Sequence, residues 1–214
     1  MRRVDSPTER TTAATDAILV GLALAAAIYL PFIGQQPWKT VIWASAFGLL
    51  AIAAASGAIA HGIKLSDTSL KWIWRLIYLA LGQTVALFMV GTVYDVWGPA
   101  AARQLLPAML LVGIIFFAFT LIRSGTFFIF IIYQAVAMLF ALGGYIWLAW
   151  SSRLDGAWLM VAGILVTMIA AAVQAGRSVS FAFIWQFDHN GAYHLIQMVG
   201  IALLAAGLRM GLQS

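Results

Sequence analysis

The chain carries seven long apolar runs with few charges, and each run is long enough to cross a lipid bilayer as a helix. A helix of about 20 apolar residues spans the roughly 30 Å hydrocarbon core of a membrane. The runs are continuous rather than alternating, which excludes the strand pattern of a membrane barrel. The sequence therefore predicts an all-α, polytopic membrane protein, a seven-transmembrane-helix bundle with spans at about residues 16–34, 40–63, 70–96, 101–122, 126–150, 157–175 and 192–208.

The composition excludes several classes of protein. Of the 214 residues, 64% are hydrophobic and only 9% are charged, whereas soluble domains carry about 25% charged residues. Soluble enzymes, nucleic-acid-binding proteins and disordered tails are therefore excluded. The net charge of +5 comes from basic residues that lie singly between apolar runs, so we expect no nucleic-acid partner. Because the chain has no Cys, it has no disulfide, thiolate metal site or Cys nucleophile.

Most connections between the runs are short, which predicts antiparallel neighbours in one bundle. The connection at 176–190 is longer and rich in aromatic residues, which suits a position in the lipid headgroup layer. The expected organisation has three parts: a cytoplasmic N-terminal tail at 1–15, a seven-helix transmembrane domain at 16–209 and a short C-terminal tail at 210–214.

The distribution of basic residues predicts the orientation, because cytoplasmic loops carry an excess of Lys and Arg. With seven spans, the side of the N-terminus receives eight of them: Arg2, Arg3, Arg10, Lys64, Lys71, Arg75, Arg123 and Arg177. The other side receives four: Lys39, Arg103, Arg153 and Arg209. We therefore expect a multi-pass protein of the plasma (inner) membrane with a cytoplasmic N-terminus.

The chain has only three histidines, and the predicted topology puts all of them at one membrane face. His61 closes the second span, which runs toward the side of the N-terminus, while His189 and His194 flank the start of the seventh, which leaves from that side. Ionisable groups are costly at membrane depth and are functional candidates there. Three neutral imidazoles suit a catalytic Zn²⁺ ion that keeps a fourth position for water. We therefore treat His61, His189 and His194 as candidate metal ligands.

Carboxylates at the same face could assist such a site, although ordinary structural roles remain open for each group. Asp67, at the start of the third span, could orient an imidazole or take the proton of the bound water, or could simply be solvated. Asp188 could instead cap the seventh helix, and His61 could cap the end of its own helix. His194 lies one turn into the last span and needs a polar partner inside the bundle. Asp95 belongs to the opposite face, where interface anchoring is expected.

These residues resemble the motifs of the CREST superfamily, the seven-helix membrane hydrolases that unite alkaline ceramidases with the progestin and adiponectin receptors. The resemblance consists of seven spans, Ser56 and His61 near the end of the second, Asp67 near the start of the third, and His189 and His194 opening the seventh. In that family three His hold Zn²⁺, the Asp holds or polarises the metal-bound water, and the Ser assists. The resemblance therefore implies Zn²⁺ as cofactor and catalytic roles for Asp67 and Ser56.

The last histidine pair departs from the family pattern. The family usually spaces this pair as His-x3-His, whereas His189 and His194 are five residues apart. Residues five apart on a helix point about 140° away from each other. Both imidazoles can therefore meet one ion only if His189 precedes the regular helix.

The leading hypothesis is an integral membrane zinc-dependent hydrolase that acts on a lipid amide or ester, with membrane lipids as partners and a lipid as substrate. Two alternatives stay open. One is a haem-binding electron-transfer protein with two His as axial ligands. The other is a non-catalytic transporter or sensor, for which helices broken at mid-membrane are expected.

Overall fold

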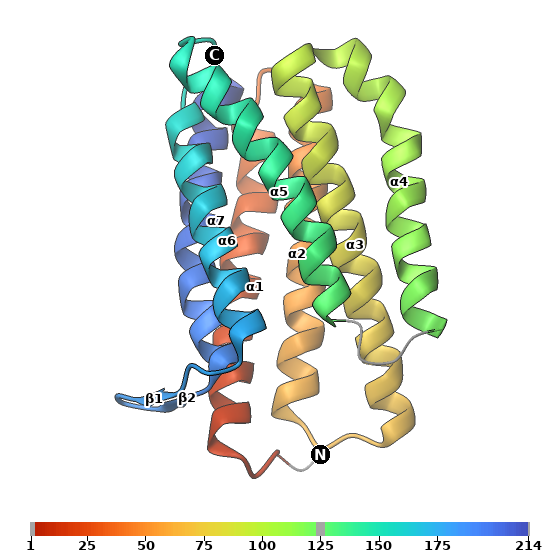
Figure 1. Ribbon diagram of the computed structural model, residues 1–214, viewed down its shortest axis with the longest axis vertical. Coiled ribbons are helices and arrows are strands. Elements are labelled where there is room, and N and C mark those ends of the chain that lie inside the picture. The colour runs from red at the N-terminus through yellow and green to blue at the C-terminus, as the bar shows by residue number, and fades with distance from the viewer. Residues whose placement is uncertain (1–2, 123–126, 214) are drawn as a thin grey trace.

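The computed structural model describes residues 3–122 and 127–213, which form a bundle of long helices with its two chain ends on opposite sides (Figure 1). Within these ranges all seven helices are long and apolar enough to cross a membrane. They are α1 Pro7–Ile33, α2 Pro37–Gly62, α3 Asp67–Trp97, α4 Pro99–Ile122, α5 Phe127–Trp150, α6 Ala157–Gly176 and α7 His189–Gln213. The predicted all-α bundle of seven spans is confirmed, and the protein is a multi-pass membrane protein. Arg2 and Arg123 of the charge count, and the connection expected at 123–125, lie outside the described residues.

Helix α1 begins at Pro7, well before the expected start of the span at Asp16. Proline suits the first position of a helix because its missing N–H would be unpaired there. The Ser6 side chain caps this helix by accepting a hydrogen bond from the Glu9 backbone N–H at 3.5 Å. Asp16 is therefore inside a continuous helix, where it is buried together with Thr15.

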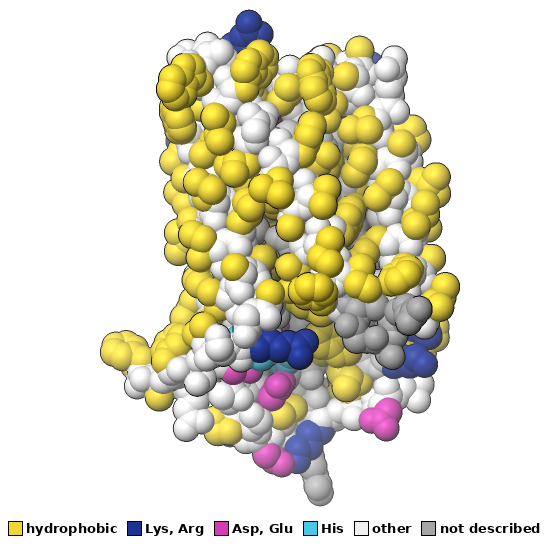
Figure 2. Space-filling model, viewed as in Figure 1, with side chains coloured by type: hydrophobic (Ala, Val, Ile, Leu, Met, Phe, Trp, Pro, Cys, Tyr) yellow, Lys and Arg dark blue, Asp and Glu magenta, His cyan; other side chains and the backbone are white. Residues whose placement is uncertain are grey.

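The order of packing places the first and last helices of the chain side by side. Helix α1 lies between α2 and α7, α3 packs between α2 and α4, and α6 lies between α5 and α7. The main core contains buried side chains from α1, α2, α3, α5, α6 and α7, with Trp43 and Tyr145 among the largest. Large apolar side chains cover the outer surface, and charged groups gather toward its two ends (Figure 2). This distribution is the one that a bilayer requires of a helical protein.

A short hairpin interrupts the connection between α6 and α7. Strands β1 Phe181–Ala182 and β2 Gln186–Phe187 are antiparallel, with Phe181 opposite Phe187. The hairpin projects sideways from the bundle, across the direction of the helices (Figure 1).

The residues before α1 are tied to the end of α2. The Val4 N–H donates to the Gly62 carbonyl at 3.2 Å, and the Lys64 ammonium forms an ion pair with Asp5. This ammonium lowers the pKa of the Asp5 carboxyl below its ordinary value. Both side chains of the ion pair are exposed, so we expect it to add little to stability.

Candidate functional site

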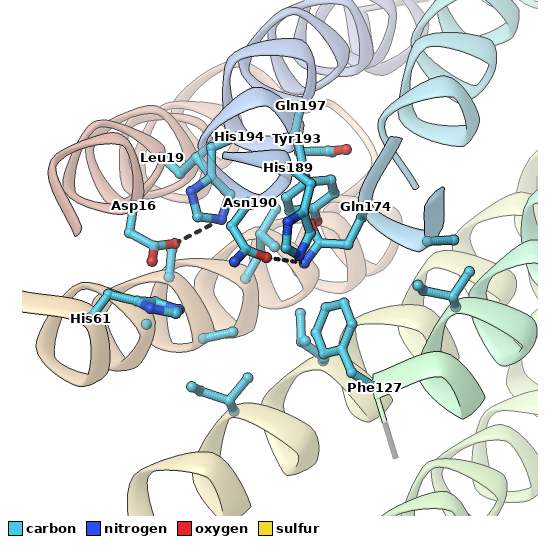
Figure 3. Close-up of a pocket in the computed structure, with 18 of the residues that line it drawn as sticks. Asp16, Leu19, His61, Phe127, Gln174, His189, Asn190, Tyr193, His194 and Gln197 are labelled. Atoms are coloured by element: carbon cyan, nitrogen blue, oxygen red, sulfur yellow. Dashed lines mark hydrogen bonds and ion pairs between the residues drawn. The ribbon is translucent and has the colours of Figure 1, made fainter. Parts of the chain in front are cut away.

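A cavity of about 310 Å³, lined by both polar and apolar side chains, opens at the end of the bundle where α1 and α7 begin and α2 ends. Side chains from α1, α2, α6 and α7 point into it (Figure 3). Its polar lining comprises Asp16, His61, Gln174, Arg177, His189, Asn190, Tyr193, His194 and Gln197. The three imidazoles predicted to share one membrane face therefore line one cavity.

His194 is buried and has a partner on each ring nitrogen. Its Nδ1 lies 2.9 Å from the Thr15 hydroxyl, and its Nε2 lies 3.3 Å from Asp16 Oδ1 (Figure 3). The Thr15 hydroxyl donates its own proton to the carbonyl of Thr12 at 2.9 Å, so it accepts one from His194 Nδ1. His194 Nε2 thus faces the Asp16 carboxyl group, and the two side chains form an ion pair when the imidazole carries both protons. Asp16 and His194 form a buried carboxyl–imidazole pair, and the need of His194 for a polar partner is met.

A glycine on α2 allows Asp16 to reach this position. A Cβ atom at Gly57 would lie 2.6 Å from Asp16 Oδ2, which leaves no room for any larger residue. The carboxylate therefore packs directly against the α2 backbone, one turn before His61. Asp16 was not predicted as a site residue, because the first predicted span begins at this position. Its signal was the run Thr12, Thr15 and Asp16, which lies on one face at helical spacing.

The His61 ring is held by groups from two neighbouring helices. Its Nδ1 lies 2.6 Å from Glu9 Oε2 on the first turn of α1. The His61 ring and the Trp74 ring of α3 pack edge to face, with 5.9 Å between their centroids and 89° between their planes. The first turn of α1 and the start of α3 thus fix the orientation of this imidazole at the cavity wall.

The start of α7 is organised by Asp188 and Asn190. Asp188 Oδ1 accepts the backbone N–H groups of Asn190 and Gly191, each at 3.0 Å. The capping role is confirmed, and Asp188 does not line the cavity. The Asn190 side-chain oxygen accepts from Gln174 Nε2 at 2.8 Å, which joins α6 to α7 at the cavity wall (Figure 3).

The imidazoles line one cavity but do not meet at one point. His189 is the first residue of α7 rather than a residue before it, so its side chain and that of His194 leave the helix in different directions. Among the residues described, no three His, Asp or Glu side chains are close enough together to hold one metal ion. The arrangement therefore does not fit the expected zinc site of three imidazoles.

The two residues expected to assist catalysis lie outside the cavity. Asp67 begins α3 as an exposed residue. Ser56 is buried, and its hydroxyl donates to the Ile52 carbonyl of its own helix at 2.8 Å. Neither side chain is among those that line the cavity.

A smaller apolar pocket of about 70 Å³ adjoins the first cavity toward the centre of the bundle. The two share lining residues from α2, α3 and α7: Leu50, Leu81, Tyr193, Gln197 and Ile201. The deeper walls come from large apolar side chains, with Trp43, Phe47 and Phe88 among them. Together the two spaces form a compartment of mixed polar and apolar lining with an apolar extension.

The opposite end of the bundle holds a second polar cluster, which was not expected. The Lys39 ammonium lies 2.6 Å from Asp95 Oδ1 and donates to the Gly211 carbonyl at 2.8 Å. The Tyr145 hydroxyl donates to Asp95 Oδ2 at 2.7 Å. The interface-anchoring role expected for Asp95 is wrong, because its side chain is only 1% exposed.

Comparison with known proteins gives a family but no function. The family model described as "Family of unknown function (DUF6962)" matches residues 11–213, so the chain belongs to this family. No curated protein and no solved structure matches the chain.

Proposed function

We propose that this member of the DUF6962 family is an integral membrane hydrolase that acts on an amide or ester bond of a lipid. The observation that carries the proposal is the buried Asp16–His194 pair, with 3.3 Å between its polar atoms, at the wall of a cavity that has an apolar extension. A buried carboxylate with an imidazole beside it is an arrangement suited to proton transfer. The apolar extension offers a place for a lipid chain.

The reaction is a general acid–base hydrolysis. The carboxylate of Asp16 takes a proton from a water molecule while the water oxygen bonds to the carbonyl carbon of the lipid. His194, with its Nε2 at 3.3 Å from Asp16 Oδ1, positions the carboxyl group. The carbon–nitrogen or carbon–oxygen bond then breaks, and the proton passes from Asp16 to the leaving amine or alkoxide. The products are a fatty acid and an amine or alcohol, so all atoms balance.

His61 and Arg177, at the cavity wall, could stabilise the negative charge that develops on the carbonyl oxygen of the lipid during the reaction. The His61 ring is positioned by Glu9 at the cavity wall, and Arg177 also lines the cavity. Donors fixed before the reaction stabilise an oxyanion more than mobile water does. No step passes through a zinc ion, because the described donors are not gathered around one point.

The alternatives are less well supported. His194 has partners on both ring nitrogens, so this residue is not available as an axial haem ligand. Helices α1 and α4 continue through Pro31 and Pro107, whereas a transporter of the expected kind has broken helices. We also propose a cytoplasmic N-terminus and location in the plasma (inner) membrane, supported by the excess of basic residues on that side. The cavity then opens toward the cytoplasmic leaflet.

Fatty-acid release by the purified protein tests the proposal. A long-chain N-acyl sphingosine and a diacylglycerol serve as the amide and ester probes, and mass spectrometry measures the products. We expect release from one of the two probes, with loss of activity in Asp16→Asn and His194→Ala. The control Asp67→Asn, outside the cavity, should keep the wild-type rate. No release from either probe, or full activity in Asp16→Asn, would overturn the proposal.

A further inference from the structure

We infer that the hairpin between α6 and α7 inserts its tip into the membrane, in the leaflet on the side of the N-terminus. The tip consists of Phe183, Ile184 and Trp185, whose exposed fractions are 85%, 79% and 55%. Three consecutive large apolar side chains exposed at a turn are costly in water. The inference concerns how the protein meets lipid and does not depend on the proposed hydrolysis.

The hairpin is fixed to the bundle at its base, so its tip has a defined place. Phe187 is buried, and its ring stacks on Phe181 with 4.8 Å between centroids and 12° between planes. A Cβ atom at Gly191 would lie 3.0 Å from the Phe187 ring, so this ring packs closely on the first turn of α7. The Phe183 N–H donates to the Trp185 carbonyl at 3.1 Å and closes the turn. A closed turn on an anchored base presents the three apolar side chains outward.

The depth of the tip follows from its neighbours on α1. The tip residues line a groove with Arg10, Thr11 and Ala14, and the apolar run of α1 starts at Ala17. At 1.5 Å per residue, Ala14 lies about 5 Å from the start of that run. The polar layer on each side of the hydrocarbon core is about 5–8 Å thick. The tip therefore lies within the headgroup layer, next to the acyl chains.

The direction of the hairpin and the positive charge near its tip indicate that the tip contacts lipid and not a partner protein. The hairpin points sideways, toward the space that lipid fills around the helices, and not along the helix axes toward water (Figure 1). Arg10 and Trp185 line the same groove, and a groove with both a cation and an indole in its wall suits the headgroup layer and its phosphates. The surface of the tip is also continuous with the lipid-facing surface of a membrane-spanning bundle.

Insertion at this point has a consequence for the cavity. The hairpin connects the end of α6 with the start of α7, and β2 is followed within two residues by His189. A tip held in the headgroup layer therefore holds His189 and Asn190 at a fixed depth, with the cavity mouth close to the lipid headgroups.

The absence of cysteine makes a direct depth measurement available. Ile184→Cys gives a protein with one thiol, which is labelled with a nitroxide in vesicles of phosphatidylcholine and phosphatidylglycerol. Ser178→Cys, exposed in the same connection but outside the hairpin, is the matched control. We expect a higher ratio of oxygen to nickel-chelate accessibility at position 184 than at position 178. Equal ratios would place the tip in water, and a label shielded from both reagents would indicate a protein contact; either result overturns the inference.

A second measurement uses the native side chain and avoids the label. Lipids brominated in the upper acyl chain should quench the tryptophan emission of the wild type more than that of Trp185→Tyr. Equal quenching in the two proteins contradicts insertion, whether or not the protein hydrolyses lipid.

Discussion

The Lys39 ammonium and the Asp95 carboxylate lie 2.6 Å apart, with side-chain exposures of only 2% and 1%. Removal of two charges from water is costly, and a buried pair is tolerated when further hydrogen bonds satisfy both groups. Here the Gly211 carbonyl and the Tyr145 hydroxyl supply them. The pair therefore joins α2, α3, α5 and α7 at the end of the bundle remote from the cavity.

Removal of one partner should destabilise the protein strongly. Asp95→Leu leaves the Lys39 charge buried and unpaired, which costs about 3–5 kcal/mol. The thermal unfolding midpoint of the protein in detergent should fall, and the double variant Lys39→Met with Asp95→Leu should recover much of the loss. A single variant as stable as the wild type would show that the pair contributes nothing.

Because Asp16 packs against the α2 backbone at Gly57, adding a single methyl group at this position should lower the rate of hydrolysis. Gly57→Ala places a Cβ atom 2.6 Å from Asp16 Oδ2 and must displace the carboxylate. A misplacement of about 1 Å at a reacting group can reduce the rate about 100-fold. Fatty-acid release should fall accordingly, while the helical content measured by circular dichroism is kept.

A matched control for this variant lies on the same helix. A Cβ atom at Gly48 meets nothing within 4 Å, so Gly48→Ala should hydrolyse lipid at the wild-type rate. Equal rates in the Gly57→Ala and Gly48→Ala proteins would contradict the assigned position of Asp16.

The hydroxyl of Thr15 should be needed for the buried position of His194. Thr15→Val removes the acceptor of His194 Nδ1, and an unpaired buried donor costs about 1–3 kcal/mol. We expect a lower unfolding midpoint and a lower rate of hydrolysis. Thr11→Val is the control, because the Thr11 hydroxyl donates only to the Pro7 carbonyl of its own helix. The assignment fails if both variants behave alike.

Metal analysis separates the acid–base mechanism from the zinc mechanism implied by the CREST resemblance. We expect well under one zinc ion per chain in protein purified without chelator, and no loss of hydrolysis after dialysis against EDTA. A content near one ion per chain that disappears in His61→Ala and His194→Ala would support the zinc mechanism instead.

The sequence predicted the helices well because hydropathy is a local property. Runs of about 20 apolar residues identify spans without knowledge of their neighbours, and the topology then placed all three imidazoles at one end. The capping role of Asp188 could also be considered from sequence, because a cap depends only on the residues that follow it.

The pairing of polar groups between helices could not be predicted in this way. The contacts of Asp16 with His194 and of Lys39 with Asp95 depend on which helix faces are turned toward each other. The direction of the His189 side chain depends on whether α7 begins before or after that residue, and boundaries are the least certain part of a sequence-based prediction. Both the helix faces turned toward each other and the direction of the His189 side chain determine whether the polar groups surround a metal ion or form a carboxyl–imidazole pair.

The placement of α1 against α7 also bears on how the protein is made. The buried polar face of α1, with Thr15 and Asp16, meets its imidazole partner only after the last helix has been synthesised. Until then the first helix must reside in the lipid, or beside an insertion factor, with an unsatisfied carboxylate. The buried polar face of α1 is therefore completed only when the last span is in place.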